Sequence, residues 1–571
     1  MLTTAIRELR RALDDPARQP EWIATQHGKG YRFLKDVDAR EVHPGRRAVS
    51  RESMAADQPR RWPHLLILVA GLALAAGAVW WLTSRSDTNG DAAAMAETSE
   101  DAERTSLAIL PFATSDVEPW IAGAFVGQIE HVLKQTGDIT IVERGGGFSP
   151  APTGIAEARS AGVRRVLTGD VSKSGDTVEL VLRLVDTRTE DAVWEQRLSG
   201  SSTDLLPLFE SSAIAVARSM NTATRRDELA EMAQVGTKSL LAFEEFEKGQ
   251  RIFDEASIHA SIAEVQAGFR HVEKALEHDP QFARAAYLLT YNRWGSFGTV
   301  FAEPMVDLDV AYRRHLNLLD VGIVNASNDV ERTLYRSQKA SATLKLREAV
   351  RLLEQYLRKR PNDEVARENL MIGYAQVGNW DGVGRMLDSL AASAMARGQV
   401  PIYSPTYLSH DASRAEQWAA RLALPDTNDF QKFYAQGIYL VAGDRNAGLR
   451  VGRTIDPAKL DGDLRNLLEA RTMCAEGRHA QGRKLALDLL AKSDARDGSL
   501  LPVAQVGAPD YDVRKLLPPD DTPAQRALLS QFLVNPWLDT SRFPKLRAIL
   551  AEQGIERGPI GAMPFSCKPR P

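Results

Sequence analysis

The stretch RRVLTGDVSKSGDTVELVLRLVDTRTEDAVWEQRL, residues 164–198, decides the fold of the part of the chain around it. Polar turn residues interrupt it at Ser174–Asp176 and at Thr187–Asp191, so the pattern predicts three strands joined by two turns. Side chains two residues apart on a strand point to the same face. One face of the middle strand is therefore predicted to be apolar, formed by Val178, Leu180, Leu182 and Leu184.

Strand-like and helix-like segments alternate in the residues before this stretch. LAILPF (107–112) and ITIVER (139–144) are typical of strands. WIAGAFVGQIEHVLKQ (120–135) and GIAEARSAGV (154–163) indicate helices. The order, with the pieces AILPF, AGVRRVLTGDV and VWEQRL, resembles the TolB N-terminal-like (FlgO-like) module. The resemblance covers residues 106–220 and implies an α/β domain. Its aspartates lie at or near predicted turns, the usual place for aspartate, so no catalytic role is predicted for them.

The charge of the chain is unevenly distributed. It has 571 residues, with 71 Lys and Arg against 75 Asp and Glu, a formal net charge of −4. Residues 1–63 carry 13 basic and 9 acidic side chains, net +4, so the remainder carries −8. This length predicts several domains, and the basic one is expected at the N-terminus.

An uninterrupted apolar run, LLILVAGLALAAGAVWWL, occupies residues 65–82. At 1.5 Å per residue it is long enough for most of a bilayer core, so the sequence predicts a transmembrane helix at 64–83. Residues 37–63 before it and the acidic residues 84–105 after it are predicted linkers. Since arginines precede the run and acidic residues follow it, the N-terminus is expected in the cytoplasm and the C-terminal region in the periplasm. The predicted location is a bacterial inner membrane, crossed once.

The residues before this run combine a basic helix with a hairpin. LTTAIRELRRALDD (2–15) has an apolar stripe that includes Ile6 and Leu9, with arginines on its other faces. WIATQHGKGYRFL (22–34) indicates two strands around Gly28-Lys29-Gly30. Such a helix suits a DNA major groove, and a basic-tipped ribbon suits the phosphate backbone.

These N-terminal residues resemble the C-terminal part of an OmpR/PhoB-type winged-helix domain, as found in CadC/ToxR-like membrane-anchored regulators. The resemblance covers residues 1–36, the recognition helix and the wing. It implies a set of DNA-contacting residues: Thr3, Thr4, Arg7, Arg10, Arg11, His27, Lys29 and Arg32. The earlier sheet and helices of that domain do not precede this segment, so either translation starts upstream or the domain has been truncated.

Residues 238–560 are predicted to be helical. Segments such as GFRHVEKALEHDPQFARAAYLLT (268–290) place two amphipathic helices on either side of Asp279-Pro280, and similar pairs turn at Pro361, Gly378-Asn379 and Gly477. They resemble tetratricopeptide helix pairs, with irregular spacing, and so imply an α-helical solenoid that binds a protein or peptide. The fold class is thus multidomain: a partial winged helix, a single transmembrane helix, an α/β module and a tetratricopeptide-like solenoid.

No cofactor, metal site or catalytic residue is predicted, because the histidines and carboxylates form no recognisable catalytic or metal motif. The two cysteines, Cys474 and Cys567, either remain free thiols or pair in an oxidising compartment.

Two functions follow as hypotheses. The first is a one-component transmembrane transcription regulator, not an enzyme, whose partners are promoter DNA, the inner membrane and an extracytoplasmic protein or peptide. Half-site geometry would favour a homodimer on DNA. The alternative is a membrane-tethered periplasmic interaction scaffold that has lost its DNA-binding domain. An enzyme of the cyclase type is disfavoured because no cyclase or kinase segment is present.

Overall fold

A computed structural model describes twelve segments of the chain. They are residues 23–26, 30–33, 106–136, 138–142, 147–259, 262–290, 307–396, 405–424, 427–460, 462–492, 500–557 and 563–567. The chain divides into two compact units, Met1–Trp62 and Pro63–Pro571, and each is described by itself.

The first unit contains the predicted hairpin. Strands β1 (Ile23–Gln26) and β2 (Gly30–Phe33) pair antiparallel, with Ile23 opposite Phe33 and Gln26 opposite Gly30. The ribbon prediction is confirmed.

The second unit begins with a mixed sheet in the strand order β5-β3-β6-β7-β8, with β4 also paired to β6. Its strands are β3 (Ser106–Ile109), β4 (Ala113–Ser115), β5 (Thr140–Ile141), β6 (Arg165–Ser174), β7 (Thr177–Asp186) and β8 (Ala192–Ser201). β3 runs parallel to β5 and β6, whereas β6, β7 and β8 are antiparallel neighbours. The three strands predicted from residues 164–198 are confirmed. Gly175 makes the first turn with φ 59°, a backbone conformation that suits glycine.

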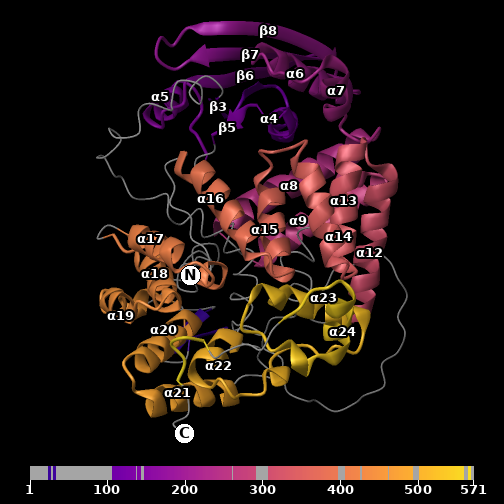
Figure 1. Cartoon of the computed structure of the whole chain (residues 1–571). Coiled ribbons are helices and arrows are strands. Elements are labelled where there is room, and N and C mark those ends of the chain that lie inside the picture. The colour runs from indigo at the N-terminus through magenta and orange to yellow at the C-terminus, as the bar shows by residue number, and fades with distance from the viewer. Residues whose placement is uncertain are drawn as a thin grey trace. The chain divides into compact units, whose positions relative to one another are not determined.

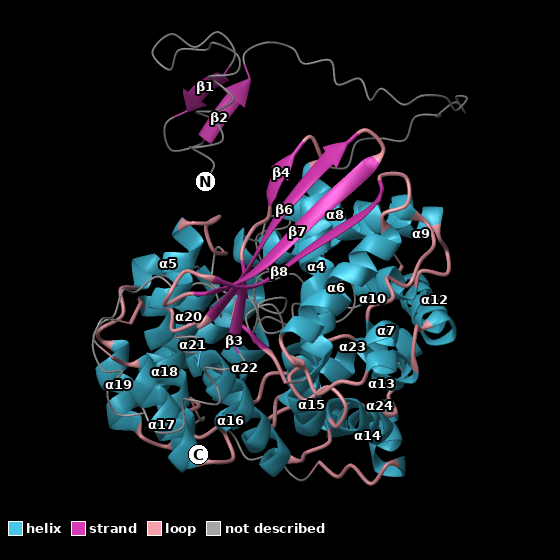
Figure 2. Ribbon diagram, turned by 90° about the horizontal axis from the view of Figure 1, so that it is seen from above, coloured by secondary structure: helices cyan, strands magenta, loops and turns pink. Residues whose placement is uncertain are grey.

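Helices cover this sheet on both faces. The predicted apolar face of β7 packs on α4 (Pro119–Thr136) and α6 (Leu206–Ser219), where Phe125 and Phe209 are fully buried and lie 4.6 Å apart between ring centroids. Helix α5 (Thr153–Ser160) covers part of the opposite face through Ala158. We call residues 106–219 the α/β module; its strands and helices form separate layers in Figures 1 and 2.

The remainder of the second unit is helical. A first group of helices is α7 (Arg226–Met232), α8 (Leu240–His259), α9 (Ile262–His278), α10 (Ala283–Thr290), α12 (Leu308–Asn325), α13 (Asp329–Ala342), α14 (Leu346–Leu357), α15 (Glu364–Gln376) and α16 (Trp380–Ala396). A second group is α17 (Ala412–Leu422), α18 (Asp429–Ala442), α19 (Arg445–Gly452), α20 (Gly462–Ala475), α21 (His479–Lys492), α22 (Leu501–Gly507), α23 (Pro523–Ser530) and α24 (Pro544–Glu552). Short 3-10 turns, η3 (Pro405–Leu408), η4 (Pro457–Lys459), η6 (Val513–Lys515), η7 (Gln531–Val534) and η8 (Thr540–Arg542), connect some of them.

Successive helices pack against each other in pairs, for example α8 with α9, α13 with α14 and α17 with α18. The helices break where the sequence predicts: at Asp279-Pro280, at Pro361, at Gly378 (φ 77°) and at Gly477 (φ 79°). We call α8 to α24 the helical array. Its arrangement is consistent with a helical solenoid.

A disulfide closes the end of the array. Cys474 in α20 bonds Cys567 in the C-terminal segment, 93 residues further along the chain. Both cysteines are buried, and the backbone N–H of Cys567 donates to the carbonyl of Val506 at 2.7 Å. Of the two alternatives left open by the sequence, the paired state is the one that the structure contains.

The predicted fold class needs correction. The described residues are mostly helical with one small mixed sheet beside the two-stranded ribbon. None of the described helices is both long enough and apolar enough to cross a bilayer. The predicted transmembrane helix at 64–83 lies outside the described residues. The predicted single-pass placement in a bacterial inner membrane therefore has no support in the structure and is withdrawn.

Candidate functional site

Most of the residues predicted to contact DNA lie outside the described segments. These are Thr3, Thr4, Arg7, Arg10, Arg11, His27 and Lys29. Arg32 is in β2, opposite Ala24 of β1. The structure thus confirms the ribbon but does not test its role in binding DNA.

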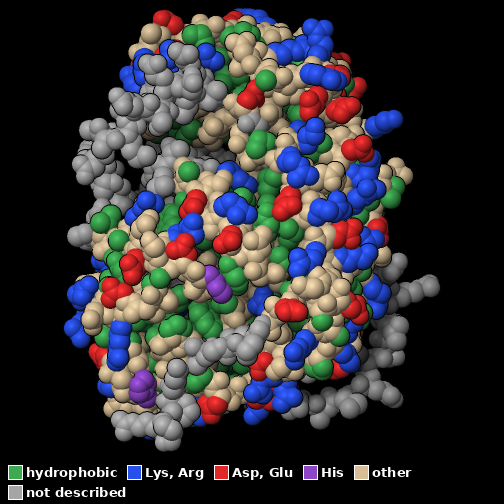
Figure 3. Space-filling model, viewed as in Figure 1, with side chains coloured by type: hydrophobic (Ala, Val, Ile, Leu, Met, Phe, Trp, Pro, Cys, Tyr) green, Lys and Arg blue, Asp and Glu red, His purple; other side chains and the backbone are tan. Residues whose placement is uncertain are grey.

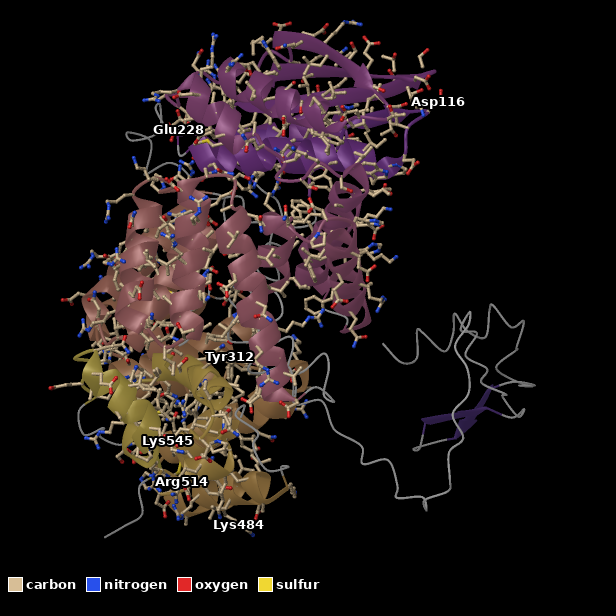
Figure 4. The ribbon with its side chains drawn as sticks, turned by 90° about the vertical axis from the view of Figure 1, so that its right-hand side faces the viewer. Asp116, Glu228, Tyr312, Lys484, Arg514 and Lys545 are labelled. Carbon is tan, nitrogen blue, oxygen red and sulfur yellow. A yellow bond between two sulfur atoms is a disulfide. The ribbon has the colours of Figure 1, made fainter. Side chains whose placement is uncertain are left out.

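A different site lies where α7, which follows the α/β module, meets the helical array. A cavity of about 330 Å³ opens between α7, the α12–α13 loop and the residues after α14. Its lining residues are Glu228, Glu231, Met232, Ser327, Asn328, Asp329, Val330, Arg332 and Arg360. We call it the junction cavity. Glu228 marks its position in Figure 4, beside the boundary between the α/β module and the first helices of the array.

The loop at the cavity wall is held by hydrogen bonds within the chain. Asn328 caps α13, its Oδ1 accepting from the N–H groups of Val330 at 3.0 Å and Glu331 at 2.9 Å. Arg332 donates to the carbonyls of Ile323 at 3.2 Å and Ala326 at 3.3 Å, and it pairs with Asp329. The guanidinium of Arg332 therefore binds groups of the α12–α13 connection itself.

Arg360 has an unusual environment. It is only 4% exposed, and its NH1 donates to the carbonyl of Lys359 at 3.0 Å and lies 3.7 Å from the Oε1 of Glu228. Its Nε is buried and has no hydrogen-bond partner in the structure. The Nδ2 of Asn328 is likewise buried without a partner. Buried polar groups are nearly always hydrogen-bonded, so these two donors are exceptions at one cavity.

A buried polar layer lies behind the cavity and links the α/β module to the array. Gln128 of α4 donates from Nε2 to the carbonyl of Ala233 at 2.7 Å, and its Oε1 accepts from Arg284 of α10 at 2.9 Å. His131, one turn along α4, lies 4.0 Å from the Oε1 of Glu331. Side chains from helices far apart in the sequence thus meet here.

Burial sets the protonation of this layer. Burial, followed by the positive charge of Arg284, lowers the pKa of His131 well below its usual value. Burial raises the pKa of Glu331, an effect opposed by Arg284 and Arg360. His131 is therefore neutral near pH 7, and its contact with Glu331 is not a charged pair.

No metal site accompanies this layer. Among the residues that the structure describes, no group of three or more His, Cys, Asp or Glu side chains could hold a metal ion.

Sequence reasoning did not identify the junction cavity. Gln128 and Arg284 are 156 residues apart, and each occupies an ordinary position on an amphipathic helix. A single sequence carries no signal that they meet. The one local signal was the Ser-Asn-Asp start of α13, which is typical of a helix N-terminus.

The surface around the array carries both charges. Figure 3 shows Lys and Arg side chains interspersed with Asp and Glu over the face that it displays. On β7 and β8 the exposed charges form pairs, such as Arg183 with Glu195 at 2.8 Å and Arg197 with Glu179 at 3.5 Å. A mixed surface of this kind is not typical of a site that tracks nucleic-acid phosphates.

No protein-family model matches the chain, and no curated protein matches it either. The resemblances to the CadC/ToxR-like regulators, to the TolB N-terminal-like module and to tetratricopeptide pairs therefore remain predictions.

Proposed function

We propose that the chain is a regulatory ligand-binding protein rather than an enzyme. In this proposal a small molecule occupies the junction cavity and stabilises one arrangement of the α/β module relative to the helical array. The observation that carries the proposal is the buried guanidinium of Arg360, whose Nε has no partner and which lines the cavity.

The energetic argument concerns the cost of leaving such a group unsatisfied. A buried donor without an acceptor costs about 1–3 kcal/mol, and more if it is charged. The Nε has no accessible surface in the present arrangement, so a ligand oxygen would reach it through the change of arrangement proposed above, removing that cost and gaining a charge-assisted hydrogen bond. Ligand sites often occur where two structural modules meet, and this cavity has that position.

The lining residues also favour binding over catalysis. They include no histidine, cysteine or lysine. Ser327 is the lining residue that carries a hydroxyl. None of the lining residues is a histidine or lysine that could act as the general base for this hydroxyl. The carboxylates of Glu228 and Glu231, at the α7 side of the cavity, are more exposed than the buried guanidinium of Arg360.

The test is a thermal-shift screen of the full chain with representative carboxylates, amines, amino acids, phosphates and sugars at millimolar concentration. At least one class should raise the melting temperature of the wild type and not that of Arg360→Met. The matched control is Arg358→Met, because Arg358 is exposed two residues away; it should respond as the wild type does. If no class stabilises the wild type, the proposal is wrong.

A second candidate function is DNA binding by the first unit. The observation that favours it is the antiparallel ribbon, in which Gln26 pairs with Gly30. Lys29 lies between these two residues in the sequence. In the resembling winged-helix domains this ribbon lies along DNA. We propose that Arg7 and Lys29 contribute to phosphate and groove contacts.

Binding of the full chain to duplex DNA should weaken steeply as salt rises, since phosphate contacts release counterions. Arg7→Ala should weaken it further, while Arg358→Met, in the other unit, should not. Binding that is absent at low salt would contradict this second candidate and leave the first untouched.

A further inference from the structure

We infer that the outer edge of β8 pairs with the same edge of a second copy of the chain, so that the sheets of two α/β modules join into one. The two β8 strands run antiparallel about a twofold axis at Gln196. This surface is separate from the junction cavity, because none of the residues that line that cavity belongs to β8.

β8 is the last strand of the sheet. It follows β7 in the strand order, and among the residues that the structure describes no strand pairs with its other side. Figure 1 shows it as the outermost strand of the α/β module. It is 10 residues long and contains no proline or lysine, two residues that commonly protect a sheet edge from pairing. The register with β7 shifts between Leu184 and Val185, opposite the start of β8, so the strand is regular from Trp194 onward.

The register identifies the backbone groups of β8 that point away from β7. The N–H of Ser202 donates to the carbonyl of Asp176 at 2.8 Å. In an antiparallel pair every second residue bonds to the same neighbour, so the even-numbered residues of regular β8 bond to β7. The N–H and C=O groups of Glu195, Arg197 and Ser199 therefore point outward. Such a row of edge groups is a template for another strand.

The charges of β8 select one register for a twofold pair. With the axis at Gln196, Glu195 lies opposite Arg197 of the partner subunit, and the same pair recurs on the other side of the axis. The side chains of Glu195 and Arg197 are 42% and 64% exposed, so both are available. Moving the axis by one residue sets Glu195 or Arg197 opposite its own copy, and like charges directly opposite each other are destabilising. An axis between two residues sets outward-pointing backbone groups opposite inward-pointing ones.

The other face of β8 gains an apolar contact in the same register. Trp194 and Leu198 are half-buried and pack against the core of the module. In the proposed pair, Trp194 lies opposite Leu198 of the partner subunit. Cross-strand pairs between an aromatic and an aliphatic side chain stabilise a sheet, so both faces of β8 favour the register that the charges select.

Charges on an edge strand usually deter pairing, but here their spacing makes the edge complementary to itself. Glu195 contacts Arg183 of its own chain at 2.8 Å, and Arg197 of the partner subunit would approach it from the other side. A strand from a different protein would need its own matching charges, whereas a second copy supplies both. A contact along one strand is small beside a standard interface of about 1,200–2,000 Å², so we expect a dimer that dissociates on dilution.

Sedimentation velocity of the full chain, from low to high micromolar concentration, tests this inference. The wild type should shift from monomer to dimer as its concentration rises. Glu195→Arg and Arg197→Glu should each weaken self-association at least about tenfold, because each creates two like-charge pairs across the axis. The matched controls Glu277→Arg and Arg270→Glu, at exposed positions of α9, should associate as the wild type does.

A mixture of the two charge-reversal variants tests the register. In a mixed dimer the introduced arginine lies opposite the introduced glutamate, and the unchanged Arg197 lies opposite the unchanged Glu195. The mixture should therefore dimerise as the wild type does, although neither variant does so alone. Mixing cannot repair a folding defect. If either reversal prevents folding, Glu195→Gln and Arg197→Gln take its place, and each should still weaken self-association.

Three results would overturn the inference. They are a wild type that stays monomeric at every concentration, dimers that all the Glu195 and Arg197 variants leave intact, and folded charge-reversal variants whose mixture stays monomeric. Self-association is measured without any ligand. The thermal-shift screen of the junction cavity can therefore succeed or fail independently of it.

Discussion

The disulfide between Cys474 and Cys567 should make a large contribution to the stability of the second unit. It joins residues 93 positions apart and so removes much of the conformational freedom of the unfolded chain. For a loop of this length the chain-entropy relation gives about 4.7 kcal/mol at 25 °C, near the top of the usual range. Measured values are commonly lower, so we expect a loss of about 3 kcal/mol when the bond is absent.

The disulfide also fixes the C-terminal segment, residues 563–567, against the helical array. Met563 and Phe565 are buried beside it, and the backbone N–H of Cys567 is bonded to Val506. A β-carbon on Gly482 of α21 would lie 2.6 Å from the Sγ of Cys567, so the helix approaches the sulfurs closely. Without the covalent bond, the C-terminal segment is held by these contacts alone.

The assay is urea unfolding of the full chain with and without a thiol reductant, compared with the Cys474→Ala/Cys567→Ala variant. The wild type should lose about 3 kcal/mol in reductant, and the variant should be equally unstable in both conditions. If reductant changes the stability of the wild type by less than about 0.5 kcal/mol, within the scatter of neutral surface substitutions, the reasoning is refuted.

Three further predictions follow from buried groups. Burial raises the pKa of Glu368 from 4.5 to about 7, and the negative charge of Glu364 adds to the rise. The folded state therefore binds the proton more tightly, and wild-type stability should fall by about 2 kcal/mol between pH 5 and pH 8; Glu368→Gln should not show this fall in urea unfolding. Arg284→Met should lower the free energy of unfolding by about 2–4 kcal/mol, because it leaves the Oε1 of the fully buried Gln128 without its donor. Arg270→Met, at an exposed position, is the matched control. Equal losses of stability in the two variants would contradict the account. Gly249→Ala should lower the free energy of unfolding by about 1–3 kcal/mol, because the new β-carbon would lie 2.6 Å from a side-chain atom of Val272 where α8 and α9 meet. An unchanged melting temperature would contradict this close packing of the two helices.

Local patterns in the sequence predicted much of the fold. The alternation of Val178, Leu180, Leu182 and Leu184 placed them correctly on one buried face, because a strand has a side-chain period of two. Gly378 and Gly477 end helices with positive φ, a conformation that glycine adopts without steric cost. In each case the physical cause lies within a few residues of its effect.

The candidate site could not be predicted in this way. The cavity brings together α7, the start of α13 and Arg360, and the polar layer behind it brings together Gln128 and Arg284. These contacts depend on how whole helices pack. The local sequence around each of these side chains is typical of a surface position. The prediction of membrane placement rested on the apolar run at 65–82 and the charges on either side of it, and no described helix is long and apolar enough to support it.

The central claim is that a ligand occupies the junction cavity. Hydrogen–deuterium exchange of the full chain, with and without the compound that raises its melting temperature most, tests it most directly. The account predicts slower exchange in residues 226–232 and 327–332, the two segments that contain most of the lining residues, and unchanged exchange in α24. Protection confined to other segments, or none in these two, would contradict it.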